Sequence, residues 1–146
     1  MYWRDRSLGH GTPKKRAMKR IVSAGSEPGL LAYADGVAVG WVSIAPREEY
    51  AALLRSPQYR PRDEDENVWS IVCFTIDKPL RGDGVVDALL EGAVAHACAR
   101  GASAVEAYGH VSDRGDYMGS RDLYLTHGFE PVRAASKRRI MRRRCA

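Results

Sequence analysis

An apolar strand, a glycine-containing turn and a long helix follow one another in the middle of the sequence and limit what the chain can fold into. The run Val68–Ile76 has the length and composition of a strand in the interior of a sheet. In the helix, apolar side chains recur on one face from Val85 to Ala97, and Gly101 closes it. The next short strand is Ala104–Tyr108. This order predicts an α/β sheet in which a right-handed crossover joins two parallel strands.

Elements on either side extend this unit into a mixed sheet. A first helix is expected between Pro13 and Gly25, where apolar residues recur at helical spacing. Two strands, over 30–34 and 37–45, are separated only by Asp35-Gly36, which supplies the positive φ angles of a two-residue hairpin turn. Short helices over 48–55 and 119–127 and last strands over 129–133 and 138–142 complete the prediction. The arginine-rich last strand is expected at the sheet edge, with its polar side chains solvated.

Length and composition exclude several classes of protein. The 146 residues, 45% hydrophobic and 28% charged, suit one ordinary globular core, and we expect a single domain over residues 1–146. No apolar run reaches the roughly 18 residues of a membrane span, and no apolar segment follows the basic N-terminal residues as in a signal peptide. We therefore expect a cytoplasmic protein that does not contact a membrane.

The cysteines predict neither a disulfide framework nor a metal site. Cys73, Cys98 and Cys145 are odd in number and have no close spacing. Cys73 and Cys98 lie in apolar runs, where buried free thiols are common. We therefore expect free thiols and no bound metal.

The net charge of +5 is unevenly distributed along the chain. Basic residues dominate 1–20 and 133–146, whereas 21–132 has an excess of acidic residues, including the run Asp63–Glu66. Basic ends are compatible with a nucleic-acid partner. Solvated surface or a phosphate-bearing ligand explains them equally well, so we expect no nucleic-acid partner and treat the acidic run as a solvated loop.

The turn before the long helix, Arg81–Val86 with the sequence RGDGVV, carries the clearest chemical signal. Glycine lets backbone N–H groups approach a ligand, and the first helical turn leaves such groups unpaired, which suits a pyrophosphate. Neither a Walker A loop nor a complete dinucleotide fingerprint is present. The segment resembles motif A of the GNAT superfamily of N-acetyltransferases, Q/R-x-x-G-x-G/A. Arg81 and Gly84 match this motif, and Val86 stands where glycine or alanine is usual.

Further segments extend the resemblance over nearly the whole chain. Leu123–Phe129, LYLTHGF, resembles the family's L-Y-x-x-x-G-F signature, and the hairpin Gly29–Ala45 resembles its second and third strands. Five segments also resemble an actinobacterial-type subgroup that carries MYWR, GLLAY, VGWVS, APRE and VWSIVCF. They are Met1–Arg4, Gly29–Tyr33, Val39–Ser43, Ala45–Glu48 and Val68–Phe74.

The resemblance implies a partly splayed mixed sheet, flanked by helices, whose cleft holds acetyl-CoA. The backbone of Phe74, Thr75 and Ile76 would then pair with the pantetheine arm. The pyrophosphate would be held by the turn, that is by Arg81, Gly82, Asp83, Gly84, Val85 and Val86. An amine would attack the thioester directly in a ternary complex.

Tyr124 occupies the family's general-acid position. A phenol with a pKa of about 10 can donate a proton to a departing thiolate, although a tyrosine packed in the core would give the same pattern. The base is open among His110, at a strand end, and the carboxylates Glu48, Glu49 and Glu106. We expect Glu48, Glu49 and Trp41 to border the acceptor pocket, with surface solvation of the glutamates and core packing of Trp41 as alternatives.

Three functions remain open at this point. The first is acetyl transfer from acetyl-CoA to a small-molecule amine, and the second is acetylation of a protein N-terminus or lysine. The third is a non-catalytic acyl-CoA-binding regulatory module. Only the departures from the family pattern support the third, namely Val86 and the replacement of the usual Asn and Ala by Tyr117 and Ser120. A homodimer through strand edges rests on fold analogy alone.

Overall fold

The computed structural model describes all residues from 1 to 146 and contains one six-stranded sheet with the order β1-β2-β3-β4-β6-β5. The strands are β1 Gly29–Ala34, β2 Val37–Pro46, β3 Val68–Ile76, β4 Ala104–His110, β5 Glu130–Ala135 and β6 Arg138–Arg144. The helices are α1 Thr12–Ser23, α2 Ala51–Arg55, α3 Val85–Ala99 and α4 Arg121–Thr126, with 3-10 turns at Arg47–Glu49 and Lys78–Leu80. Only β3 and β4 pair in parallel; the other neighbours are antiparallel. The α/β prediction and the parallel pair are confirmed.

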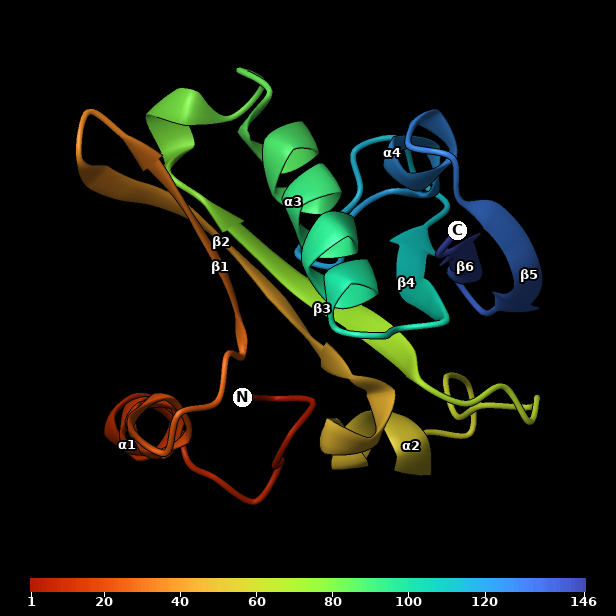
Figure 1. Cartoon of the computed structure of the whole chain (residues 1–146), viewed down its shortest axis with the longest axis horizontal. Coiled ribbons are helices and arrows are strands. Elements are labelled where there is room, and N and C mark those ends of the chain that lie inside the picture. The colour runs from red at the N-terminus through yellow and green to blue at the C-terminus, as the bar shows by residue number, and fades with distance from the viewer.

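Two hydrophobic clusters, one on each face, hold the sheet. The larger lies under α3 and α4 and joins Phe74 of β3 to Leu90 of α3 and Tyr124 of α4. The smaller lies on the other face, where the N-terminal segment and α2 contribute Trp3 and Leu53. Figure 1 shows that α3 runs across the sheet, and that α1 and α2 lie below the sheet in this view. The sheet is therefore covered on both faces.

A bulge in β3 bends the strand at its middle. Ser43 of β2 pairs with Cys73, but the next residue, Ile44, pairs with Ile71, so Val72 is an extra residue without a partner. Such an insertion bends a strand and increases its local twist. The bend therefore directs the second half of β3 away from its original line.

β3 and β4 separate beyond this bulge. Their pairing is confined to Val68–Ser70 with Ala104–Glu106, although β3 runs to Ile76 and β4 to His110. The predicted partly splayed sheet is therefore confirmed. We call the paired part the closed end of the sheet and the separated part the open end.

The prediction of a solvated edge strand at the C-terminus is wrong. β6 pairs along its length with β4 on one side and β5 on the other, which makes β5 the edge strand. Two of its arginines are paired rather than solvated: Arg138 is only 9% exposed, and Arg142 contacts three carboxylates. An arginine can occupy an interior strand where acidic side chains neutralise it.

The acidic run is a loop, as expected, but it is not simply solvated. Asp63 and Asp65 accept hydrogen bonds from Arg142, at 2.7 Å each, and Asp63 also accepts one from Arg47 at 3.3 Å. Glu106 of β4, only 2% exposed, accepts from Arg142 and from Arg47. The charges that are separated along the sequence thus neutralise one another at the closed end.

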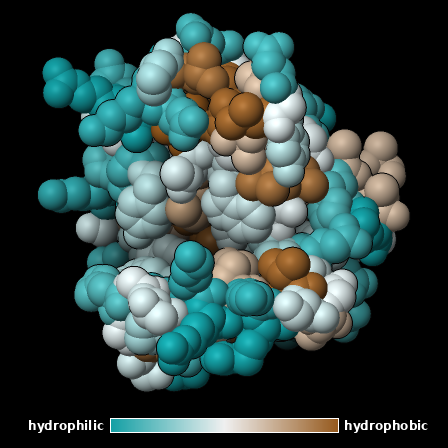
Figure 2. Space-filling view, turned by 90° about the vertical axis from the view of Figure 1, so that its left-hand side faces the viewer, coloured by the Kyte–Doolittle hydropathy of each residue, from teal (hydrophilic) through white to brown (hydrophobic).

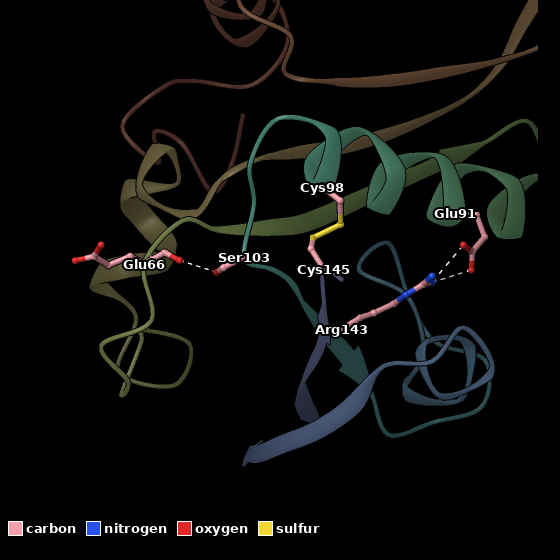
Figure 3. Close-up of a disulfide and its surroundings, with 6 residues drawn as sticks. All are labelled: Glu66, Glu91, Cys98, Ser103, Arg143 and Cys145. Carbon is pink, nitrogen blue, oxygen red and sulfur yellow. Dashed lines mark hydrogen bonds and ion pairs between the residues drawn. A yellow bond between two sulfur atoms is a disulfide. The ribbon is translucent and has the colours of Figure 1, made fainter.

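The expectation of a free thiol at Cys98 is wrong. Cys98, on the last turn of α3, forms a disulfide with Cys145, just after β6, with the two Cα atoms 5.6 Å apart (Figure 3). The two residues are 47 positions apart, so their spacing gives no sign of the pairing. Ser103 lies near the disulfide in Figure 3 and donates to the carbonyl of Glu66 at 2.6 Å, just before β3 and β4 begin their pairing. The disulfide therefore lies at the closed end. Cys73 is the free cysteine.

Candidate active site

A groove of about 520 Å³ lies where β3 and β4 separate. One wall is the end of β3, Phe74–Ile76. Another is formed by Arg81 of the turn and by Val86 at the start of α3. The remaining lining residues follow β4 and are Arg114, Asp116, Tyr117 and Gly119. The structure thus brings the predicted coenzyme residues of β3 together with Arg81 and Val86 of the turn in one groove, whereas Gly82–Val85 are not among its lining residues. It also adds a wall that the sequence did not indicate.

The turn Arg81–Val86 has the backbone of an anion site. Gly82 and Gly84 adopt φ angles of 89° and 83°, which side-chain-bearing residues rarely adopt. A Cβ at either glycine would meet no atom within 4 Å, so the backbone angles rather than space require glycine. No protein acceptor faces the N–H groups of Gly84, Val85 and Val86. Gly84 is the N-cap residue of α3, and no side chain accepts a hydrogen bond there. Unpaired N–H groups beside the exposed Arg81 fit a pyrophosphate.

Val86 lines the groove and packs on the larger core. Its side chain is half-buried, so part of it faces the groove and part replaces core volume. Arg81 extends along the turn, and its Nε donates to the carbonyl of Ile76 at 3.2 Å. The valine therefore narrows the groove without closing it.

Tyr124 lies behind the groove rather than in it. Its side chain is fully buried, and its hydroxyl donates to the carbonyl of Met118 at 2.5 Å. Burial raises the pKa of the Tyr124 phenol well above its usual value of 10.0. A Cβ added to Gly119, which lines the groove, would fall 2.8 Å from this hydroxyl. Gly119 thus separates the phenol from the groove.

The two base candidates on β4 are both engaged. Nδ1 of His110 accepts the N–H of Ser112 at 3.0 Å, which places the proton of a neutral ring on Nε2 and leaves no free lone pair. Glu106 lies at the closed end, where Arg47 and Arg142 neutralise it and Tyr108 donates to it at 3.0 Å. In this arrangement neither residue is a free base.

An apolar chamber of about 180 Å³ lies on the other face of β3, between the sheet and the N-terminal segment. Its lining residues are Met1, Tyr2, Trp3, Arg4, Met18, Trp41, Ser43, Tyr50, Val72, Cys73 and Tyr117. Seen from the side of α1 and the hairpin, the surface carries hydrophobic patches among hydrophilic residues and is hollowed between them (Figure 2). Trp41 is thus placed in a cavity wall, half-buried, rather than wholly in the core.

Glu48 and Glu49 do not line this chamber. Both are exposed on the 3-10 turn after β2, and Glu49 forms an ion pair with Arg4 at 2.8 Å. Tyr50, the next residue, does reach the chamber, and its hydroxyl lies 3.0 Å from that of Ser43. Burial raises the pKa of Tyr50 to about 12, so its phenol stays neutral.

Sequence reasoning missed Tyr117, which lines both the groove and the chamber. Its carbonyl accepts the N–H of Phe74 at 2.6 Å, so it is joined to β3 at the mouth of the open end. Its side chain is 47% exposed, and burial raises its pKa. The only signal in the sequence was its departure from the family's usual asparagine.

Two further findings bear on the class of protein. No group of three or more His, Cys, Asp or Glu side chains is arranged to hold a metal ion. None of the helices is both long and apolar enough to cross a membrane.

Comparison with known proteins agrees with this geometry. The model of the acetyltransferase (GNAT) family matches residues 1–129, and the chain belongs to this family. Membership supports acetyl transfer as its activity. No curated protein sequence matches the chain significantly.

Solved structures of low sequence identity share the fold. The PaiA N-acetyltransferase of Thermoplasma acidophilum, in complex with coenzyme A, has a TM-score of 0.61 at 14% identity, over 90% of this chain and 70% of that one. A GNAT acetyltransferase from Streptococcus pneumoniae gives 0.61 at 17% identity, over 94% and 78%. Ard1 from Thermoplasma volcanium gives 0.59 at 14% identity, over 96% and 84%.

Proposed function

We propose that the protein transfers the acetyl group of acetyl-CoA to a primary amine of a small molecule, by direct attack in a ternary complex. The observation that carries this proposal is that the groove and the apolar chamber meet at Tyr117, which lines both. Ligands that fill the two cavities would therefore meet beside the bulged part of β3.

On the coenzyme side, the proposed contacts are the turn Arg81–Val86 and the backbone of Phe74–Ile76. The free N–H groups of the turn and the Arg81 guanidinium would bind the pyrophosphate, and the open end of β3 would align the pantetheine arm. The bound coenzyme supplies an activated acetyl thioester, whose carbonyl carbon accepts the amine while the thiolate leaves. The groove residues thus act by holding the reacting groups in position.

Tyr124 and His110 are the proposed proton carriers. The Tyr124 hydroxyl would donate a proton to the departing thiolate, and His110 would take the proton that the amine must lose. Both residues are engaged by backbone groups of residues 112–119, so each needs that segment to move first.

The chamber is the proposed site of the acceptor's apolar part. Its aromatic walls are Trp3, Trp41 and Tyr50. The chamber volume of about 180 Å³ accommodates a small amine, but not a lysine together with the folded protein that carries it. The small enclosed volume favours a small-molecule acceptor over a protein N-terminus or lysine. In the same proposal, the exposed carboxylates Glu48 and Glu49 attract a cationic amine towards this side.

Several finer points belong to the same proposal. They are membership of the actinobacterial-type subgroup, action of residues 1–146 as one domain, a cytoplasmic location and a homodimer through exposed strand edges. In a reducing cytoplasm Cys98 and Cys145 would be held as thiols.

Calorimetric titration with acetyl-CoA tests the coenzyme site. We expect micromolar binding, weakened about tenfold by Arg81→Ala through the loss of charge-assisted hydrogen bonds. Lys78→Ala, which removes an exposed cation of the neighbouring 3-10 turn outside the groove, is the matched control and should bind normally. Absence of binding at millimolar acetyl-CoA would contradict the proposal.

Mass spectrometry of a panel of amines incubated with acetyl-CoA tests turnover. Tyr124→Phe should lose turnover while it retains coenzyme binding, because it removes only the phenolic hydroxyl, which lies outside the groove lining. If acetyl-CoA binds and no amine or peptide is acetylated, the non-catalytic acyl-CoA-binding module becomes the better description.

A further inference from the structure

One short segment engages three of the groups on which the proposed reaction depends. Within Ser112–Gly119, the Tyr117 carbonyl accepts the Phe74 N–H at 2.6 Å, and the Met118 carbonyl accepts the Tyr124 hydroxyl at 2.5 Å. The N–H of Ser112 donates to Nδ1 of His110 at 3.0 Å. A backbone amide, a phenol and an imidazole lone pair are therefore all occupied by the same eight residues. We call this segment the strap.

Residues of the strap line both cavities. Arg114, Asp116, Tyr117 and Gly119 line the groove, and Tyr117 also lines the chamber. Gly119 stands between the groove and the Tyr124 hydroxyl, since a Cβ there would come within 2.8 Å of it. A ligand chain that follows the exposed backbone of β3 would compete with the Tyr117 carbonyl for the Phe74 N–H.

An ion pair, one buried side chain and several hydrogen bonds hold the strap in place. Its main side-chain anchor is Asp116, which accepts hydrogen bonds from Arg138, at 2.9 Å for Nη1, and from the N–H of Met118 at 3.0 Å. Asp113, Arg114, Asp116 and Tyr117 are exposed, and the segment forms no helix or strand. Met118 is the one side chain of the strap that is fully buried, in the smaller hydrophobic cluster. The exposed remainder opens at a lower free-energy cost than the sheet beside it.

We propose that the strap is an autoinhibitory gate: coenzyme binding in the groove displaces it and thereby frees the Phe74 N–H, the Tyr124 hydroxyl and Nδ1 of His110 together. The inference rests on the proposed function, because it assigns the groove to the coenzyme. The acid and the base become available only when the coenzyme is bound, so the site is assembled by its own ligand. The apparent affinity is the affinity of the open form multiplied by the fraction of molecules that are open.

Hydrogen exchange of the unaltered protein tests displacement directly, with coenzyme A rather than acetyl-CoA as the probe. Five of the eight strap amides have acceptors in the closed arrangement, at Ser112, Arg114, Gly115, Met118 and Gly119. We expect peptides covering 112–119 to exchange faster when coenzyme A is bound. Binding with equal or greater protection of the strap would overturn the gate.

Two matched variants test the energetic coupling. Asp116→Asn weakens the anchor to Arg138 and should increase the affinity for coenzyme A by up to about fivefold, because the closed arrangement loses a charge-assisted pair. Asp113→Asn makes the same change of charge in the same segment at a side chain without a hydrogen-bond or ion-pair partner, and should leave the affinity unchanged.

The outcomes separate the gate from the proposed function. Asp116 also lines the groove, so tighter binding by Asp116→Asn alone supports the gate when coenzyme A also speeds the exchange of the strap. Tighter binding without faster exchange of the strap overturns the gate. Equal affinities in all three proteins overturn the gate and leave the coenzyme site intact. Absence of binding in all three, with circular dichroism confirming folded protein, overturns both.

Discussion

Two arginines of β6 hold two loops, and they do so to different degrees. Arg142, at the closed end, contacts Asp63, Asp65 and the buried Glu106. Arg138, four residues earlier and on the same face of the strand, contacts one carboxylate, Asp116 of the strap. The same chemical device thus fixes the loop 56–67 through two acids, with Glu106 of β4 as a third partner of the arginine, and the strap through one.

The difference matches what each end of the sheet has to do. At the closed end β3 and β4 remain paired, and Arg47 gives Glu106 a second cation. At the open end the strands have separated, and Gly119 of the strap lines the groove beside the Tyr124 hydroxyl. Several ionic partners hold the loop 56–67 firmly at the closed end. The strap, held by a single carboxylate, can detach more easily at the open end.

Arg142→Ala would break the closed end and should have the largest effect. Glu106, only 2% exposed, would keep one cation in place of two, and breaking a buried pair costs about 3–5 kcal/mol of unfolding free energy. Urea denaturation measures the loss. Arg144→Ala is the control: its side chain is 65% exposed and pairs only with Asp65, so it should cost less than about 1 kcal/mol. Equal costs for the two variants would mean that Glu106 does not depend on Arg142.

The disulfide adds a covalent attachment to the closed end. Cys145→Ser, or reduction of the Cys98–Cys145 bond, should lower the free energy of unfolding by about 3 kcal/mol, because the cross-link restricts the unfolded chain. Denaturation with and without a reductant measures this. The reductant should leave Cys145→Ser unaffected, and an unaffected wild type would show that the two thiols are not joined in solution.

Asp116→Asn breaks the attachment of the open end and should cost only about 1 kcal/mol, since one charge-assisted pair at a partly exposed site is weakened. Burial acts to raise the pKa of Asp116, but the hydrogen bonds from Arg138 and Met118 outweigh it and hold the pKa below 3.8. The contribution is therefore present above pH 3.8 and is lost as the pH falls through the lowered value. Urea unfolding at several pH values measures it; a loss as large as that of Arg142→Ala would remove the contrast between the two ends.

His127 makes the smallest and most pH-dependent contribution. Its two ring nitrogens lie 2.7 Å from Asp87 and Glu91 of α3, which joins α4 to the helix beside the groove. Burial acts to lower the pKa of His127, but these carboxylates outweigh it and raise the pKa above 6.5. The stabilisation is fully present below pH 6.5 and disappears as the pH rises through the raised value.

The replacement His127→Gln should therefore flatten the dependence of stability on pH just above 6.5, by less than about 1 kcal/mol. Thermal melting across this range measures it. An unchanged pH profile would show that the histidine is not charged between its two neighbours.

Local patterns were sufficient to predict most of the fold. Asp35 and Gly36 adopt φ angles of 49° and 78° in the hairpin turn, and β3 has the predicted bounds Val68–Ile76. The residues Phe74–Ile76 and Arg81 could be assigned to one groove because strand, turn and helix are consecutive in the chain. Each of these features depends on neighbours that are also neighbours in sequence.

The features that could not be predicted join distant parts of the chain. Arg142 meets Asp65 across 77 residues, and Cys98 meets Cys145 across 47. Periodicity and spacing carry no information on such partners, so the buried arginines were expected to be solvated. The engagement of Tyr124 and His110 by the strap was hidden for a second reason: the partners are backbone groups, which have no residue-type signature.

The bulge at Val72 also interrupts the alternation of side chains between the two faces of β3. Side chains of a regular strand alternate between faces, but the extra residue sends two consecutive side chains, Val72 and Cys73, to the chamber side. Phe74 then returns to the side of α3. A deletion of this one residue would restore regular alternation, with Cys73 still on the chamber side and Phe74 still on the side of α3. What the deletion would remove is the bend of β3 at the bulge, beyond which β3 and β4 separate.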